Sequence, residues 1–155
     1  MSIKKNELKV LRALCKDARR TLEDIGNETG LTGPGVGKII DRLEKNDVIT
    51  GYIAVPALEK VGFNIVHLLL FRMDHSKGKA KDLQKYLRST NRIVFATTVE
   101  GSGFTHLMVS AHADFAQLEK FLTDFRSRWD EAISEDTSVL LSPRSTIKDL
   151  SFEVF

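Results

Sequence analysis

The sequence predicts a mixed α+β protein, in which an N-terminal winged helix-turn-helix is joined to a C-terminal ferredoxin-like βαββαβ domain. Three short helical patterns with turn signals between them occupy the first 45 residues. The remainder alternates apolar runs of strand length with two helical patterns. We therefore expect a winged helix-turn-helix at 1–55, a linker at 56–63 and a ferredoxin-like domain at 64–155.

The composition is that of a folded protein, with 42% hydrophobic and 28% charged residues. The segment after Met1, Ser2–Asn6, has no apolar stretch of the kind a secretion signal needs. No later apolar run approaches the ~20 residues of a membrane span. The single cysteine, Cys15, cannot form an internal disulfide, and its place on a helical pattern favours a buried thiol. These features predict a cytoplasmic protein.

The first two helices are marked by periodicity and by capping residues. The first runs from about Lys5 to Lys16, and its inward residues recur at helical spacing as Leu8, Leu11, Leu14 and Ala18. Thr21 is suited to cap the second helix, and Asp24, three residues on, resembles the acidic half of a capping box. Leu22 and Ile25 are expected to face inward. Gly30 ends this helix, since glycine adopts the left-handed conformation that closes helices.

The third helix has a polar and basic outer face. Thr32 can cap it, and Pro34 fits its first turn, where a missing N–H does no harm. Its apolar stripe is Val36, Ile40 and Leu43. Two short helices joined by a tight glycine-containing turn form a helix-turn-helix. The segment 48–55, with Gly51 near its tip, is typical of a β-hairpin and is predicted to be the wing.

The predicted chemistry of this motif is binding to double-stranded DNA. A helix N-terminus presents free N–H groups and a partial positive charge to phosphate, and basic side chains reach phosphates or guanine edges. The expected contacts are Thr21, Thr32, Gly33, Pro34, Gly35, Lys38, Arg42 and Lys45. The whole net charge of +2 lies within residues 1–52. The alternative is that the basic side chains only keep an outer helix face solvated.

Three glycines open the third helix, although each costs about 0.8–1.0 kcal/mol against alanine in a helix interior. Gly33, Gly35 and Gly37 leave few side chains there to read bases. Either the backbone approaches DNA closely, or the helix orders on binding. The stretch is not a nucleotide loop, because it lacks both the GxxxxG spacing and a Ser/Thr after Lys38.

The second domain is predicted from alternating strand and helix patterns. The expected elements are strands at 64–73, 93–100, 104–111 and 137–141, a helix at 79–89, and a helix capped by Asp114 that carries Phe115 to Trp129. Phe152 and Val154 alternate with polar residues near the end of the chain. That segment, 145–155, is interpreted either as an edge strand or as a strand paired with a neighbouring subunit.

One face of the predicted sheet requires a partner. Helices cover a single face of a βαββαβ sheet, yet the first strand is apolar on both faces, and Met108 stands beside Leu107 and Val109. An uncovered apolar sheet face indicates an interaction surface. The simplest solution is a second copy packed sheet to sheet in a two-fold homodimer.

The whole chain resembles the Lrp/AsnC family, the feast/famine transcription regulators. The resemblance rests on Asp17-Ala18-Arg19, Gly30-Leu31-Thr32, Arg42-Leu43-Glu44-Lys45 and Ile49-Thr50-Gly51-Tyr52, and more loosely on Val94, Glu100-Gly101, Thr137, Val139 and Leu140. It implies a promoter-binding winged helix-turn-helix and an amino-acid-responsive domain. It also implies dimers that assemble further, to tetramers or octamers.

The resemblance places a small, amino-acid-like effector near the turn between the second and third strands. Here that turn consists of Glu100, Gly101, Ser102 and Gly103. It departs from the family pattern, which has two aspartates, and so lacks a carboxylate that would hold an effector's ammonium group. A different effector, or none, stays open. The family's polar and basic run at 36–39 is also missing, so no operator sequence can be carried over.

Enzymatic readings find little support in the sequence. The four histidines, His67, His75, His106 and His112, have no helical metal-pair spacing, and no nucleophile motif is present. His67 and His106 are interpreted as hydrogen-bonded structural histidines or as ligand contacts. We expect no enzyme, no metal and no cofactor.

Two alternatives remain beside the regulator. Sirohaem decarboxylases resemble the same two-domain architecture, and a haem-like absorbance would favour that class. A metabolite-binding or assembly module with a DNA-silent N-terminal domain is the other. Salt-sensitive retention on heparin or duplex DNA would distinguish a DNA-binding protein from such a module.

Overall fold

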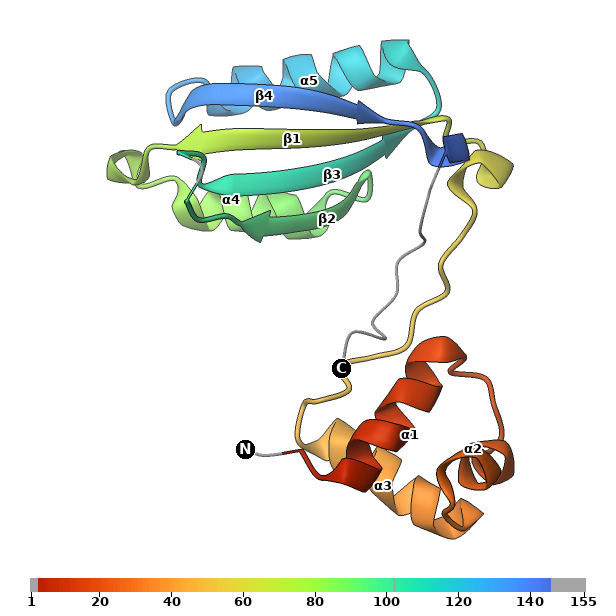
Figure 1. Ribbon diagram of the computed structural model, residues 1–155. Helices are drawn as coiled ribbons and strands as arrows, with labels where there is room; N and C mark the ends of the chain where they lie inside the picture. Colours follow the sequence, from red (N-terminus) through yellow and green to blue (C-terminus); the bar gives the residue numbers. More distant parts are fainter. Residues whose placement is uncertain (1–2, 102, 146–155) are drawn as a thin grey trace. The chain divides into compact units, whose positions relative to one another are not determined.

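The computed structural model describes residues 3–101 and 103–145, and the chain divides into two compact units between Val55 and Pro56 (Figure 1). The first unit holds three helices, and the second holds a four-stranded sheet with two helices. Each has a hydrophobic core of its own. This arrangement confirms the predicted α+β fold class. Within the described ranges, no helix is long and apolar enough to cross a membrane.

The N-terminal unit consists of α1 (Lys5–Lys16), α2 (Leu22–Thr29) and α3 (Gly33–Lys45). All three helices pack around one core. Its buried members are Val10, Ala13, Leu14, Ile25, Val36, Ile39 and Leu43. The three helices predicted from periodicity and capping are therefore confirmed.

The apolar stripes of these helices are rotated from their predicted positions. Ile39 of α3 is buried and Ile40 only partly so, while Leu22 and Ala18 are exposed instead of facing inward. Apolar residues occur on more than one side of each helix, so periodicity alone leaves the buried side ambiguous. The packing of the three short helices around one core determines which side of each helix is buried.

The turn between α2 and α3 depends on two glycines. Gly30 takes a left-handed conformation with φ of 74°, and the Leu31 N–H donates to the Gly26 carbonyl at 2.9 Å. The chain folds back so closely that a Cβ on Gly26 would lie 2.6 Å from the Leu31 carbonyl oxygen. Only glycine at position 26 therefore lets α3 follow α2 through this turn without a backbone shift.

The hairpin predicted over 48–55 is wrong, because that segment contains no strand. Tyr52, Ile53 and Val55 are exposed, Ile53 to 81%. A two-stranded hairpin is marginal in water unless it packs on something else. Here the segment is held near α3 by the Tyr52 hydroxyl, which donates to Glu44 Oε1 at 2.9 Å. A short 3-10 helix, η1 (Leu58–Val61), follows within the predicted linker.

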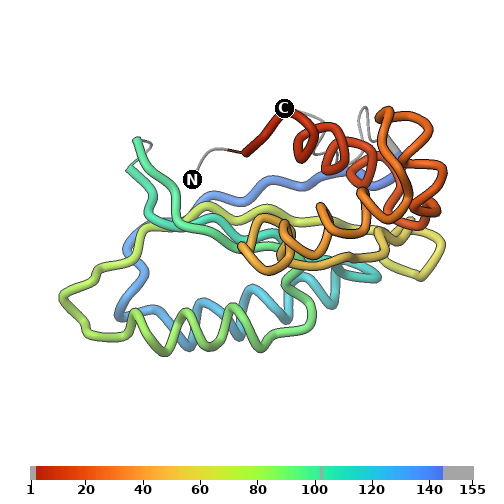
Figure 2. Tube along the Cα trace, turned by 90° about the horizontal axis from the view of Figure 1, so that it is seen from below, coloured from red at the N-terminus to blue at the C-terminus, as the bar shows by residue number. Residues whose placement is uncertain are grey.

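The C-terminal unit is a four-stranded antiparallel sheet in the order β2-β3-β1-β4. Its strands are β1 (Ile65–Met73), β2 (Ile93–Thr98), β3 (His106–His112) and β4 (Ile133–Leu141). The helices α4 (Ala80–Ser89) and α5 (Phe115–Trp129) cover the same face of the sheet (Figure 2). The βαββαβ order is confirmed, although β4 begins four residues before its predicted start. Two 3-10 helices, η2 (His75–Lys77) and η3 (Pro143–Ser145), complete the unit, and the predicted terminal strand lies largely outside the described residues.

The core of this unit lies between the sheet and its helices. It is formed by Leu69, Phe71, Met73, Leu83, Met108, Phe121, Phe125, Trp129 and Ala132. Successive side chains of a strand point to opposite faces, so the residues between these, such as Leu68, Leu70 and Val109, line the other face. There Phe95, Val139 and Leu141 are exposed. The described helices α4 and α5 leave this apolar face uncovered.

Three histidines are buried on the helix-covered side of the sheet. The His106 ring stacks on Phe71 with centroids 5.1 Å apart, and its Nδ1 lies 2.8 Å from the Thr105 hydroxyl. His112 Nε2 lies 2.9 Å from the Ser110 hydroxyl. His67 has no hydrogen-bond partner on either ring nitrogen among the described residues. His106 is therefore hydrogen-bonded as predicted, whereas no described residue bonds the His67 ring, and for His67 the alternative of a ligand contact stays a prediction.

We expect Gly26→Ala to destabilise the N-terminal unit by about 1–3 kcal/mol, because the added Cβ would force the Leu31 carbonyl to move. Gly37→Ala is the matched control. Its Cβ would lie 3.4 Å from a Leu22 methyl, so it should stabilise α3 by up to about 1 kcal/mol. Urea denaturation followed by circular dichroism measures both. Equal effects of the two substitutions would contradict the constraint at Gly26.

Candidate nucleic-acid interface

The start of α3 is an exposed, capped helix N-terminus. The Thr32 hydroxyl accepts a hydrogen bond from the Gly35 N–H at 3.3 Å, and Pro34 occupies the first turn. Thr32 and Pro34 are exposed, whereas Gly33 is buried. No residue of the first turn is acidic, so the turn itself does not oppose the partial positive charge of the helix end. The Glu23 carboxylate of α2 does lie beside Gly33, and the free N–H groups of this end face a phosphate in competition with it.

The glycines of α3 have a packing reason that sequence analysis missed. A Cβ on Gly33 would lie 3.0 Å from Glu23 Oε1, and one on Gly37 would lie 3.4 Å from a Leu22 methyl. Both contacts come from α2. A Cβ on Gly35 would instead lie 3.0 Å from the Thr32 hydroxyl that caps the helix. Of these three, only Gly33 lies where an added Cβ would press on α2, because 3.4 Å at Gly37 is an ordinary van der Waals contact; periodicity alone does not reveal this difference.

The basic residues of α3 are not equivalent. Lys38 and Lys45 are exposed. Arg42 turns toward α1, where its Nε lies 2.6 Å from Glu7 Oε1. The Glu7 side chain is only 7% exposed, and its other oxygen accepts the Lys4 N–H at 2.7 Å. Lys38 and Lys45 thus provide the positive charge of the outer face, while Arg42 joins α3 to α1.

Thr21 performs the capping role expected of it at the start of α2. Its hydroxyl accepts the Asp24 N–H at 3.1 Å and donates to Asp24 Oδ2 at 2.7 Å, which confirms the predicted capping box. These hydrogen bonds from Thr21 hold the pKa of the Asp24 carboxyl below its ordinary value. The threonine is exposed at the start of α2, but its only hydroxyl proton is donated to Asp24 while it serves as the cap.

The turn between β2 and β3 is organised by an arginine that sequence analysis did not select. Gly101 and Gly103 have φ angles of 83° and 80°. The Arg72 guanidinium donates from Nε to the Gly103 carbonyl and lies 3.2 Å from a Glu135 carboxylate oxygen. A Cβ on Gly103 would lie 2.8 Å from this guanidinium. Glu100 is exposed beside the turn, and Ser102 is outside the described residues.

No local pattern identifies Arg72 as part of the turn, because it comes from β1, thirty residues earlier in the chain. Strand pairing brings it there: Phe71, its neighbour, lies opposite His106 at the start of β3. Within the described ranges, no three or more His, Cys, Asp or Glu side chains come together as a metal site would require.

The geometry of the first unit agrees with the family model that this chain matches. Residues 3–50 match a model described as a winged helix-turn-helix DNA-binding domain. The HTH-type transcriptional regulator Rv2324 of Mycobacterium tuberculosis is 32% identical over 133 residues, which cover 85% of this chain and 88% of that protein. LrpB of Bacillus subtilis, also an HTH-type transcriptional regulator, is 31% identical over 113 residues, which cover 73% of this chain and 74% of that protein. The protein is a DNA-binding transcription regulator.

Solved structures extend the likeness across both units. A transcriptional regulator of Neisseria meningitidis, NMB0573, solved as an L-Met complex, has a TM-score of 0.85 at 16% identity, covering 99% of this chain and 96% of that one. An AsnC family regulator from Agrobacterium tumefaciens has a TM-score of 0.80 at 20% identity, and the match covers 94% of this chain and 92% of that one. These likenesses show the fold. With the relatives above, they establish that this chain belongs to the Lrp/AsnC family.

Arg42→Ala should destabilise the N-terminal unit by about 1–3 kcal/mol, because it leaves the buried Glu7 carboxylate without its cation. Lys45→Ala removes an exposed charge from the same helix and should change stability by less than about 0.5 kcal/mol. Thermal and urea unfolding measure both. In the Glu7→Gln background the Arg42→Ala cost should shrink, and an undiminished cost would show that the ion pair is not its cause.

Proposed function

We propose that this protein recognises a specific DNA sequence through α3, which enters the major groove with its N-terminus leading. The observation that carries the proposal is the capped, exposed start of α3 beside the exposed Lys38. Backbone groups at the helix start meet a phosphate, and side chains farther along reach base edges. The proposed contacts are Thr32, Gly33, Pro34, Gly35, Lys38 and Lys45, with Thr21 at a flanking phosphate.

Arg42 has a different role from the other proposed contacts. Its ion pair with Glu7 fixes the orientation of α3 on α1, so it supports the DNA-reading surface from within the unit. A half-exposed guanidinium can still reach a phosphate with its terminal nitrogens. We therefore propose Arg42 as a positioning residue that also faces DNA.

The working form is proposed to be a two-fold homodimer that can assemble further to tetramers or octamers. Support comes from the apolar sheet face that α4 and α5 leave uncovered, including exposed Phe95, Val139 and Leu141. A second copy packed on it would form an isologous interface. The dimer would then present two recognition helices to successive major-groove faces, about 34–36 Å apart or a multiple of that distance.

A small effector is proposed to bind near Glu100, Gly101, Ser102 and Gly103. The Neisseria meningitidis regulator was solved with L-Met, which supports an amino-acid-like ligand for this fold. This chain lacks the acidic pair expected at the turn but holds Arg72 there. That guanidinium already pairs with a Glu135 carboxylate oxygen at 3.2 Å, so it gives the effector no unpaired charge to bind, and we propose the effector as amino-acid-like without assigning it a charged contact at this turn.

We further propose that the protein has no enzymatic activity and acts in the cytoplasm, where promoter DNA is accessible. The relatives named as transcriptional regulators support both statements. A sirohaem-decarboxylase-like protein or a DNA-silent assembly module would not bind duplex DNA in a salt-sensitive, sequence-dependent way.

Lys38→Ala should weaken binding to the DNA upstream of the protein's own gene by about 1–3 kcal/mol if the ammonium group reads a base. A phosphate contact would instead weaken all sequences alike and reduce the salt slope by about one. Gel shifts with competitor DNA at two salt concentrations distinguish these outcomes. Lys120→Ala, an exposed lysine of α5, is the control and should bind as the wild type does. Unchanged affinity in Lys38→Ala would contradict the assignment of this helix face.

Leu68→Glu should convert the dimer to monomers and sharply weaken operator binding, because it places a charge on the proposed interface. Light scattering measures the mass, and circular dichroism checks that the unit stays folded. Gln84→Glu adds the same charge to the exposed surface of α4 and should leave the mass unchanged. A monomeric wild type would remove the dimer from the proposal.

A further inference from the structure

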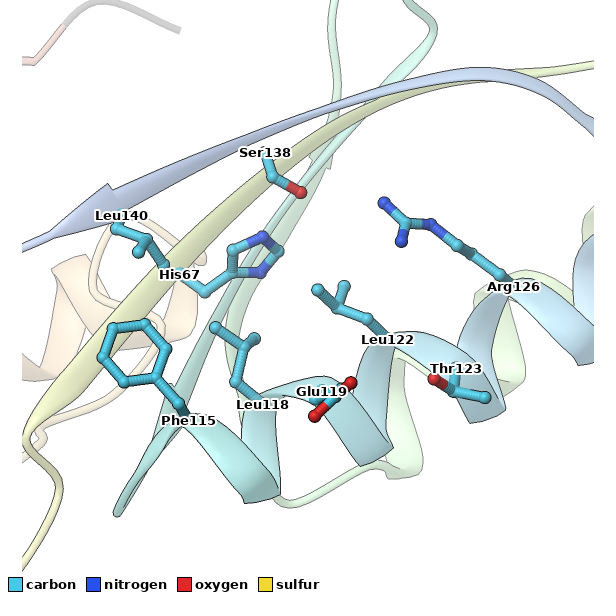
Figure 3. Close-up of a pocket in the computed structure, with 9 residues that line it drawn as sticks. All are labelled: His67, Phe115, Leu118, Glu119, Leu122, Thr123, Arg126, Ser138 and Leu140. Carbon is cyan, nitrogen blue, oxygen red and sulfur yellow. The ribbon is translucent and has the colours of Figure 1, made fainter.

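A pocket of about 600 Å³ opens between α5 and the β1–β4 edge of the sheet, on the helix-covered side (Figure 3). It includes no residue of the β2–β3 turn. Nine residues from β1, α5 and β4 line it: His67, Phe115, Leu118, Glu119, Leu122, Thr123, Arg126, Ser138 and Leu140. Its size lies in the range of small-molecule sites, and its walls are mostly apolar with a few polar groups.

His67 is the unusual member of this lining. Its ring is fully buried, points into the space between the sheet and α5, and has no partner for Nδ1 or Nε2 among the described residues (Figure 3). Buried polar groups are hydrogen-bonded in the great majority of proteins, so an unpaired one at a pocket requires an explanation. A ligand that completes the hydrogen bonding of this ring is such an explanation.

The protonation of His67 narrows the choice of ligand. Burial lowers the pKa of this histidine, the nearby Arg126 lowers it further, and Asp136 opposes the shift. The ring is therefore neutral near pH 7, with one N–H donor and one acceptor nitrogen. A hydroxyl group can serve either nitrogen, because it both donates and accepts.

The charges at the rim do not favour an anionic ligand. Arg126 already binds Asp136 through two hydrogen bonds of 2.8 Å, from Nε and from a terminal nitrogen. Glu119 adds a negative charge to the lining. No other cation occurs among the nine lining residues, so a carboxylate or phosphate would find no unpaired positive charge.

Two of the apolar side chains that line the pocket are accessible to a ligand. Phe115 is 65% exposed and Leu140 51% exposed, and both lie beside the buried His67 ring (Figure 3). Leu118 and Leu122 form the wall on α5 (Figure 3). We propose that this pocket binds a small uncharged molecule whose apolar body lies against Phe115 and Leu140 and whose single hydroxyl-like group hydrogen-bonds to His67.

Phenol and toluene form a matched pair of probes, because they differ only by a hydroxyl in place of a methyl group. In an NMR titration of the full-length protein, phenol should shift resonances of β1, β4 and α5 in a saturable way and move the His67 ring signals. It should bind about tenfold more tightly than toluene, the factor expected from about one net hydrogen bond. His67→Phe keeps a ring of similar size and should abolish that preference.

Phe115→Ser tests the apolar wall without touching the buried ring, and should weaken both probes alike. Equal affinity for phenol and toluene in the wild type would overturn the hydrogen bond to His67. Shifts centred outside the pocket, or no saturable binding by either probe at millimolar concentration, would overturn the site. If phenol leaves the His67 ring signals unchanged, water alone satisfies that ring and the proposal fails. DNA binding is measured separately, so failure here would not affect the regulator assignment.

Discussion

The approach of the Leu31 carbonyl to Gly26 determines how α3 leaves α2, and the position of the proposed DNA-facing surface depends on it. The left-handed Gly30 makes the turn, and Gly33 leaves room for the Glu23 side chain of α2. Val36, Ile39 and Leu43 then bury one side of α3 in the core, so its opposite side stays on the surface. The proposed DNA-reading face is thus set by a backbone turn and by the apolar side of the same helix.

Local sequence signals were sufficient for most of the fold. Capping residues such as Thr21 and Thr32 predict helix starts because their hydrogen bonds involve only neighbours in the chain. The hairpin at 48–55 failed for the opposite reason, since a two-stranded hairpin is stable only when it packs on another part of the protein, and the local sequence does not specify that packing. The buried side of α3 was missed in the same way: Ile39 and Ile40 are equally apolar, and only packing distinguishes them.

The local features of the candidate site could also be predicted from the sequence, but its long-range contacts could not. The capped start of α3 and the exposed Lys38 follow from composition and spacing, and the structure places both on the surface. The partners of Arg42 and Arg72 could not be predicted, because Glu7 and Gly103 lie about thirty residues away in the chain and meet them only after folding. Long-range ion pairs carry no periodicity, so a basic residue on a helix face can belong to the scaffold.

The buried histidines give the two units different responses to acid. Burial lowers the pKa of His67 and His106 below the ordinary 6.5, and that of His112 to about 4. As the pH falls below 6.5, the unfolded chain takes up protons that the folded sheet does not, so the C-terminal unit loses stability by up to about 1.4 kcal/mol per pH unit for each ring. All four histidines lie beyond residue 66, so histidine protonation does not change the stability of the N-terminal unit. Mild acid therefore acts first on the sheet that would join two subunits.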